Sequence, residues 1–313
     1  MHQINMKKDF LSITDLGLDI NTILELAVKL KTPEGFKKFQ SSLTNKSMAM
    51  IFEKSSTRTR VSFEVAMTQL GGHSLFLNSK DLQLSRGETV ADTARVISRF
   101  VDIIMYRAFD HKIMIELAKN STVPVINALD DIEHPCQIIA DFLTIMEYKG
   151  RLKGLNLVYL GDGNNVCNSL LLGSSMCGVN MKAVCPEGFL PTKEILDQAR
   201  QFAEKMGCNI TATQEPDSAV KDADVIYTDT WVSMGDETEV EERRTRFKPY
   251  QVNSQLVAKA KSDYIFMHCL PAHRGEEVTD DVMDSENSVV FDQAENRLHA
   301  QKAIILYLLE KTK

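Results

Sequence analysis

The sequence lacks a hydrophobic run long enough to cross a membrane. A spanning helix needs about 20 consecutive apolar residues, whereas the longest apolar run near the C-terminus covers only residues 303–309. The first nine residues contain no apolar segment of the secretory type, so we expect no secretory signal. Hydrophobic residues make up 43% and charged residues 25% of the chain, which predicts a soluble globular protein.

The cysteines lack the spacing of a metal site. The chain has six of them, and no two form a C-x-x-C pair. Without a secretory signal, this favours free thiols in a reducing cytoplasm over disulfides or a zinc framework. The net charge of -7 argues against a nucleic-acid-binding surface. We therefore predict a cytoplasmic protein with no metal, no nucleic-acid partner and no membrane partner.

Short apolar runs alternate with helical patterns, which predicts parallel sheets covered by helices. The expected strands are residues 48–52, 103–106, 123–126, 155–160, 181–184, 209–213, 225–228 and 264–267. The expected helices are residues 21–30, 61–70, 89–100, 113–119, 169–176, 193–206 and 295–309, and a further helix begins after His134.

The chain of 313 residues is long enough for two domains, and residues 148–154 form the expected break between them. The predicted fold class is α/β, with two doubly wound parallel-sheet domains. The first domain comprises residues 1–148 joined by the C-terminal helix 295–313, which packs back on it, and the second comprises residues 149–294. Such sheets bind ligands at the C-terminal ends of their strands, so we expect the active site in the cleft between the domains.

Residues 52–60 place hydroxyl and guanidinium groups at a predicted helix N-terminus. Four hydroxyls occupy five positions (Ser55, Ser56, Thr57 and Thr59), and Arg58 adds a planar fork suited to phosphate oxygens. The unpaired N–H groups and the dipole of a helix start favour an anion. A simple N-cap is the alternative, but it needs only one hydroxyl. We therefore predict an anion site here.

Two further groups are ambiguous when taken alone. Arg107 directly follows the strand 103–106, as a surface arginine also would. His134 and Gln137 lie three residues apart at a helix start, so both can face one ligand. A capping histidine with an exposed glutamine is an equally good interpretation of that pair.

The turn at residues 161–165 stands where a dinucleotide-binding loop would stand, but Val166 occupies a position that the pattern reserves for glycine. Its adjacent asparagines suit a zwitterion such as an amino acid, and a simple turn is the alternative. Asp229, after the strand 225–228, suits an ammonium group, and Ser233 with the following backbone suits an α-amino or carboxylate group.

The charged run 236–246 predicts either a solvated loop or a mobile lid. Cys269 ends another apolar strand, where a cysteine is more typical of packing than of catalysis.

Together these motifs resemble those of the carbamoyltransferase family. Residues 56–60 (Ser-Thr-Arg-Thr-Arg) resemble its carbamoyl phosphate signature, and residues 134–137 (His-Pro-Cys-Gln) resemble its second signature. Residues 229–235, with their Ser-Met-Gly, and residues 268–271 (His-Cys-Leu-Pro) resemble the ornithine-specific members rather than the aspartate-specific ones. The likeness covers nearly the whole chain.

The resemblance implies a role for each matching residue. It assigns the phosphate of carbamoyl phosphate to Ser56, Thr57, Arg58, Thr59 and Arg297. It places Arg107 at the phosphate and the carbonyl oxygen, His134 at the carbonyl oxygen, and Gln137 at the carbamoyl nitrogen. It assigns ornithine to Asn165, Asp229, Ser233 and Met234, and it places Cys269 and Leu270 between the two substrates. Gln83 matches a loop that in the family reaches into a neighbouring subunit, which implies a homotrimer or an assembly of trimers.

The implied reaction transfers the carbamoyl group of carbamoyl phosphate to the side-chain amine of L-ornithine, giving L-citrulline and phosphate. The first domain would bind carbamoyl phosphate and the second ornithine. No metal or organic cofactor is implied, because carbamoyl phosphate is already activated. The implied catalytic residues are Arg107, His134, Asp229 and Cys269, with Cys269 orienting the amine or accepting its proton. The alternative acceptor is a related amine such as putrescine or an acylated ornithine, and both a biosynthetic and a degradative role in arginine metabolism stay open.

Overall fold

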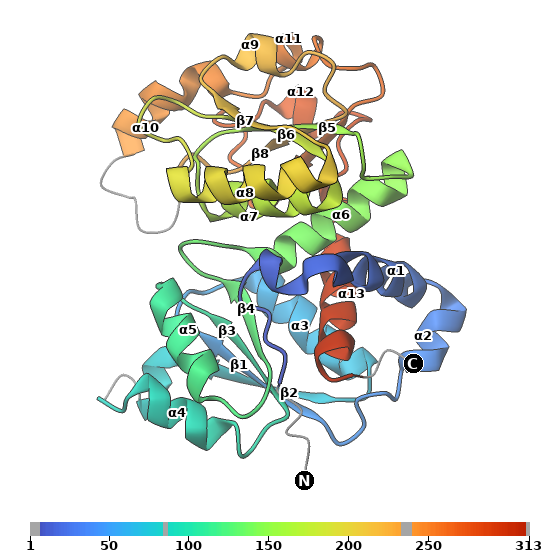
Figure 1. Ribbon diagram of the computed structural model, residues 1–313, viewed down its shortest axis with the longest axis vertical. Coiled ribbons are helices and arrows are strands. Elements are labelled where there is room, and N and C mark those ends of the chain that lie inside the picture. The colour runs from blue at the N-terminus through green and yellow to red at the C-terminus, as the bar shows by residue number, and fades with distance from the viewer. Residues whose placement is uncertain (1–6, 84–86, 233–239, 311–313) are drawn as a thin grey trace. The chain divides into compact units, whose positions relative to one another are not determined.

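A computed structural model of the protein describes residues 7–83, 87–232 and 240–310. Contacts divide the chain into two compact units (Figure 1). The first unit contains the residues up to 143 together with those from 296 onward, and the second contains residues 144–295. Two helices have residues in both units, α6 (Pro135–Lys149) and α13 (Val290–Leu308).

The first unit is built on a parallel sheet with strand order β2-β1-β3-β4. Its strands are β1 (Ser47–Phe52), β2 (His73–Asn78), β3 (Ile103–Arg107) and β4 (Val125–Leu129). Its other helices are α1 (Ile20–Lys31), α2 (Pro33–Phe39), α3 (Thr57–Gln69), α4 (Val90–Ile97) and α5 (His111–Asn120). The chain reverses its direction across this sheet after β2. Because crossovers between parallel strands are right-handed, α3 covers one face while α4 and α5 cover the other (Figure 1).

The second unit has a parallel sheet with strand order β7-β6-β5-β8-β9. Its strands are β5 (Asn156–Leu160), β6 (Asn180–Val184), β7 (Ile210–Thr213), β8 (Val225–Thr228) and β9 (Ile265–His268). Its other helices are α7 (Asn165–Cys177), α8 (Lys193–Met206), α9 (Pro216–Ala219), α10 (Val240–Phe247), α11 (Ser254–Val257) and α12 (Asp280–Met283). The reversal after β7 places α7 and α8 on one face and α9, α11 and α12 on the other.

These two sheets confirm the predicted α/β fold class with two parallel sheets. Each expected strand is present to within three residues at its ends, because most of them carry a run of apolar side chains that the structure buries. Strand β2 was not among the expected strands, because its apolar run covers only residues 75–77; all its residues are exposed or half-buried. Among the helices of the described residues, none combines the length and hydrophobicity that a membrane crossing requires.

A buried carboxylate folds the loop between β4 and α6. Asp130 is fully buried, and its side chain accepts the N–H groups of Ile132 (2.9 Å) and Glu133 (2.8 Å). It also accepts the side-chain amide of Asn127 (2.8 Å) and contacts Nδ1 of His111 at 2.6 Å. The loop therefore closes around one carboxylate immediately before His134.

We expect the His111–Asp130 pair to stabilise the fold in a pH-dependent manner. The hydrogen bond to Asp130 raises the pKa of His111. Partial burial opposes this shift, and the negative charges of Asp130, Glu133 and Asp131 add to it. Because the pKa is higher in the folded protein, the protonated histidine stabilises the fold. This stabilisation is fully present at pH values below the pKa of the unfolded chain, about 6.5, and is lost as the pH rises through the pKa of the folded protein. His111→Gln should remove this contribution, so urea unfolding at several pH values should show a deficit of about 1–2 kcal/mol at low pH that shrinks with rising pH.

His73→Gln, at an exposed position in β2, is the control and should follow the wild-type curve. A deficit in His111→Gln that stays constant across the pH range would contradict the role given to the ion pair.

Candidate active site

Each sheet has one pair of neighbouring strands from which the chain continues toward opposite edges of the sheet, called the switch point. This pair is β1 and β3 in the first sheet and β5 and β8 in the second, and polar residues follow both pairs. Ligand crevices of doubly wound sheets open at the C-terminal ends of such strands. Residues 53–59 follow β1 and Arg107 ends β3, while residues 161–165 follow β5 and Asp229 follows β8. Each unit thus has one candidate half-site.

Glu53 holds together the two strand ends of the first half-site. Its carboxylate accepts the hydroxyl of Tyr106 at 2.7 Å and the N–H of Phe109 at 2.6 Å, and its own N–H donates to the carbonyl of Arg107. The turn after β1 is therefore fixed against the end of β3, which positions Arg107 next to the start of α3.

Helix α3 begins with the predicted hydroxyl cap. The Ser56 side chain accepts the N–H of Thr59 at 3.3 Å, so Ser56 is the N-cap and Thr57 the first helical residue. Ser56–Thr59 therefore forms the first turn of α3, where the N–H groups of the helix carry a partial positive charge. The structure thus contains the N-cap that the sequence offered as an alternative, and the cap itself builds a helix start suited to an anion.

Two arginines converge on the buried hydroxyl of Thr59. Arg297, from α13, donates through Nη2 to Thr59 Oγ1 at 3.0 Å, and Arg107, from β3, donates through Nη1 to the same oxygen at 3.5 Å. Thr59 is 1% exposed, Arg297 3% and Arg107 6%. Because the hydroxyl accepts both bonds, its own hydrogen points away from both guanidinium groups, toward a further acceptor.

Gln137 completes the same group of side chains. Its Oε1 accepts from Arg297 Nη1 at 2.8 Å, and its Nε2 donates to Asp141 at 2.9 Å. These two bonds orient the amide with its oxygen toward the arginine. We refer to Thr59, Arg107, His134, Gln137 and Arg297 as the Thr59 cluster.

The Thr59 cluster is electropositive, and His134 within it is neutral. Burial lowers the pKa of His134 well below its usual value, and the positive charges of Arg297, Arg107 and Arg58 lower it further. Partial burial also lowers the pKa of Lys54, and the positive charge of Arg107 lowers it further. A neutral imidazole carries one N–H donor and one acceptor, so His134 can donate to a substrate oxygen without adding another charge.

The second half-site centres on the carboxylate of Asp229. Its Oδ2 accepts from the side-chain amide of Asn164 at 2.8 Å, and its Oδ1 accepts from the thiol of Cys269 at 2.9 Å and from the N–H of Thr230 at 2.8 Å. Asp229 is 8% exposed. The contact with Cys269 uses the thiol proton, which favours an orienting role for this cysteine. We refer to Asn164, Asp229 and Cys269 as the Asp229 cluster.

Of the two adjacent asparagines in this turn, Asn165 was assigned to ornithine, and Asn164 is the one that contacts Asp229. Asn164 is the N-cap of α7, since its Oδ1 accepts the N–H groups of Val166 (3.0 Å) and Cys167 (3.1 Å). Its amide nitrogen must then face Asp229. An asparagine directly before a helical pattern is the signal that identifies such a cap. Asn165 is the first, half-buried residue of α7, next to this bond.

A second layer of hydrogen bonds fixes the segment that carries Cys269 and Leu270. The fully buried His268 accepts the N–H of Leu270 at its Nδ1 (2.9 Å), so its Nε2 carries the proton and faces Glu277 at 3.1 Å. The N–H of His268 donates to Gln293 at 2.9 Å. Asp229, His268 and Cys269 bring ligand-type atoms within 4.8 Å of one another. Both ring nitrogens of His268 are nevertheless engaged, so these residues favour hydrogen bonding over metal binding.

The charged run after β8 is partly helical. Residues 240–247 form α10, and Arg243 on this helix is only 9% exposed. Its Nη1 donates to Asp162 at 2.7 Å and to the carbonyl of Trp231 at 3.1 Å. This part is therefore a helix rather than the expected loop, and Arg243 anchors it to the turn after β5. Its other charged residues are exposed, in agreement with the expected solvation. Ser233 and Met234 lie outside the described residues, and Gln83 is an exposed residue that follows β2 in the first unit.

Comparisons with known proteins match both units. Residues 8–147 match the carbamoyl-phosphate-binding domain of aspartate/ornithine carbamoyltransferases, and residues 153–308 match their Asp/Orn-binding domain. The chain is 58% identical over 304 residues to an ornithine carbamoyltransferase of Picrophilus torridus, covering 97% of this chain and 100% of the relative. It is 54% identical over 303 residues to a catabolic ornithine carbamoyltransferase of Thermoplasma volcanium, covering 97% and 99%.

A solved structure agrees with these relatives. The ornithine carbamoyltransferase of Pyrococcus furiosus superimposes with a TM-score of 0.92 at 57% identity, covering 96% of each chain. With both domain models matched in order and such identity over nearly the full length, this chain belongs to the aspartate/ornithine carbamoyltransferase family.

Proposed function

We propose that this protein transfers the carbamoyl group of carbamoyl phosphate to the side-chain amine of L-ornithine, giving L-citrulline and phosphate. The observation that carries the proposal is the convergence of Arg107 and Arg297 on the buried hydroxyl of Thr59, beside the helix start at Ser56. The names of the relatives support the choice of substrates.

The Thr59 cluster and the start of α3 suit carbamoyl phosphate. The phosphate would lie against Ser56, Thr57, Arg58 and Thr59, with Arg297 and Arg107 as further cationic donors. Thr59, Arg107 and neutral His134 would donate to the carbonyl oxygen, which becomes negative in the tetrahedral intermediate. Gln137, whose oxygen already faces Arg297, retains acceptor capacity for the carbamoyl nitrogen. We therefore assign carbamoyl phosphate to the first unit.

Catalysis by these residues is a matter of positioning and charge stabilisation. Carbamoyl phosphate already carries a good leaving group, so fixed donors around the carbonyl oxygen can supply the required stabilisation. Losing one such donor should raise the barrier by roughly 3 kcal/mol. The leaving phosphate is itself able to take the proton that the attacking amine releases.

The Asp229 cluster suits the amino acid acceptor. An amine like that of lysine has a pKa near 10.4, so forming the nucleophilic neutral amine at pH 7 costs about 4–5 kcal/mol. We assign Asp229 and Cys269 to orienting this amine, with Leu270 beside them, and Asn165, Ser233 and Met234 to the rest of ornithine. The second unit would thus bind ornithine. Cys269 donates to Asp229, so orientation is its first role and proton transfer a secondary one.

We also propose that the active enzyme is a cytoplasmic homotrimer or an assembly of trimers in which Gln83 reaches a neighbouring subunit. The edge strand β2 supports an interface near this residue. Leu75 and Phe76 on this strand are 42% and 37% exposed, and the guanidinium of Arg60 lies 3.8 Å from the centre of the Phe76 ring. An edge strand with exposed apolar side chains favours a protein partner.

The reaction is tested by a steady-state assay with carbamoyl phosphate and a panel of amines. Citrulline and phosphate should form in equal amounts with L-ornithine. Putrescine and acylated ornithine should be poor acceptors, because they lack the free α-amino acid group that the second unit is proposed to bind. Faster turnover of either of these amines would reassign the acceptor, and phosphate release without a carbamoylated product would exclude the transfer reaction.

Thr59→Val should impair the chemistry while leaving the chain folded. Valine keeps the shape of threonine but removes the oxygen that both arginines contact and the donor to the carbonyl oxygen. We expect kcat/KM for carbamoyl phosphate to fall by roughly 10²–10³-fold. Thr59→Ser keeps the hydroxyl and is the matched control, with a loss of only a few-fold. Equal activity in the two variants would contradict the role of the hydroxyl.

Cys269→Ala should weaken the use of ornithine selectively. The substitution removes the thiol that contacts Asp229, so KM for ornithine should rise by about tenfold while binding of a phosphonate analogue of carbamoyl phosphate stays unchanged. Cys208→Ala, a half-buried thiol in the same unit, serves as the control. A parallel loss for both substrates would show that Cys269 has been assigned to the wrong position.

A further inference from the structure

A cavity lies on the sheet of the second unit, at the edge opposite the Asp229 cluster. It has a volume of about 290 Å³ and is lined at the beginnings of β5, β6 and β7. Asn156 and Asn180 are the first residues of their strands, and Asn209 directly precedes the third. Asp229 follows the opposite, C-terminal end of β8, and strands of four to five residues separate these two edges by roughly 15 Å. The cavity is therefore separate from the Asp229 cluster.

The lining residues break the pattern of a buried parallel sheet. Ile226, Val158, Lys182 and Thr211 are neighbours in register across β8, β5, β6 and β7. Ile226 is fully buried and Val158 nearly so, whereas Lys182 is half-buried and Thr211 exposed. Parallel strands normally carry apolar side chains on both faces. Packing therefore does not account for a lysine in the middle of β6.

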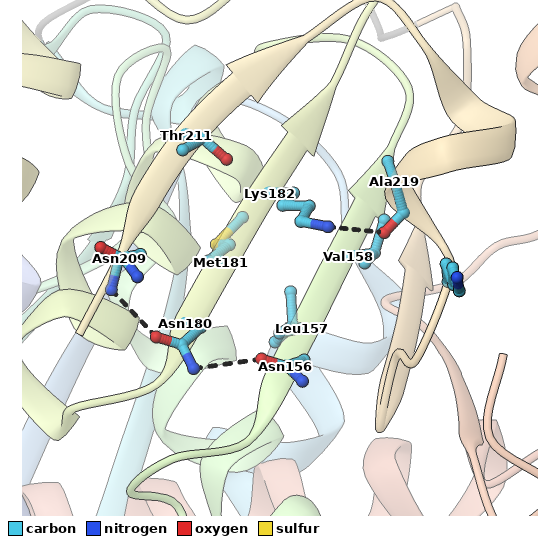
Figure 2. A pocket seen from close by; sticks show the side chains of 10 residues that line it. Asn156, Leu157, Val158, Asn180, Met181, Lys182, Asn209, Thr211 and Ala219 are labelled. Carbon is cyan, nitrogen blue, oxygen red and sulfur yellow. Dashed lines mark hydrogen bonds between the residues drawn. The ribbon is translucent and has the colours of Figure 1, made fainter.

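Two asparagine side chains near Lys182 are held in fixed orientations. The backbone N–H of Asn209 donates to Asn180 Oδ1 at 2.9 Å, so the amide nitrogen of Asn180 is the group that donates to Asn156 Oδ1 at 3.1 Å. The amide nitrogen of Asn156 in turn donates to the carbonyl of Asp222 at 3.3 Å. Figure 2 shows this line of amides crossing the strands beside Lys182 and Thr211. A backbone N–H sets the orientation of the whole line.

The cavity offers positive charge and hydrogen-bond donors. Lys182 Nζ donates to the carbonyl of Ala219 at 3.2 Å, which holds the ammonium in place and leaves two of its three N–H groups for another acceptor. Lys221, an exposed residue two positions after Ala219, and the exposed Thr211 also line the cavity. Among the described residues that line the cavity, none is an aspartate or a glutamate.

We propose that this cavity binds a small anion, a carboxylate or a phosphate, between Lys182, Lys221 and the asparagine amides. Ammonium groups and oriented amide donors complement the oxygens of such an ion. The volume fits an ion of this size with its remaining water, and it is at the lower end of the range for small-molecule sites. This site does not depend on the proposed function, since no residue of the Thr59 or Asp229 cluster lines it.

Calorimetry on the full-length protein tests the proposal. Inorganic phosphate and succinate are titrated separately, in the presence of a saturating phosphonate analogue of carbamoyl phosphate that occupies the Thr59 cluster. Sodium chloride at matched ionic strength is the blank. The test variant is Lys182→Met with Lys221→Met, and the control is Lys193→Met with Lys205→Met, which removes two exposed charges from α8 in the same unit. Crystals soaked in each anion show where it binds.

We expect one binding event per chain that persists with the analogue present, weakens about tenfold in the test variant and stays unchanged in the control variant. Density for the anion should contact Lys182, and turnover of the test variant should equal that of the wild type. A preference for phosphate or for succinate identifies which class of anion the site takes. Binding that responds equally in both double variants, or density without binding in solution, would overturn the proposal.

Discussion

The structure of the first half-site depends on placing positive charge inside the protein. Arg107 and Arg297 come from a strand and a helix that are far apart in the sequence, and both donate to the hydroxyl of Thr59. The hydroxyl, together with the Gln137 oxygen, orients the two guanidinium groups. Guanidinium groups held in fixed orientations match the oxygens of a phosphate, which is the kind of ligand that this arrangement favours.

The same charge explains the state of His134. An imidazolium beside three arginines would add repulsion to the cost of burial, so the neutral form is held and its pKa is lowered well below the usual value. The Asp130 carboxylate fixes the loop that leads into His134, and His111 pairs with that carboxylate. The position and the protonation state of His134 are therefore set by different residues.

Much of the fold could be predicted from the sequence, because buried parallel strands are continuous apolar runs. The edge strand β2 was missed, because its apolar run covers only residues 75–77 and is not buried. The hydroxyl-capped helix start at Ser56–Thr59 could also be predicted, since hydroxyls crowd one helix start. Arg297 could be assigned only through the family resemblance. Helix α13 begins at Val290, so Arg297 lies within the helix rather than at the start of one, and its contact with Thr59 spans most of the chain.

Other features depend on contacts that no local pattern encodes. The role of Asn164 became apparent only from its bond to Asp229, and the supporting role of His268 only from its contacts with Leu270 and Glu277. The asparagines that line the cavity at the beginnings of β5, β6 and β7 lie in three separate segments and meet only through strand pairing.

The most direct test of the Thr59 cluster is a crystal structure of the protein soaked with a phosphonate analogue of carbamoyl phosphate. The account predicts phosphonate oxygens against the first turn of α3 and Arg58, with the carbonyl oxygen of the analogue within hydrogen-bond distance of Thr59 Oγ1, Arg107 and His134. An analogue that binds elsewhere, without contacting the Thr59 cluster, would contradict this prediction.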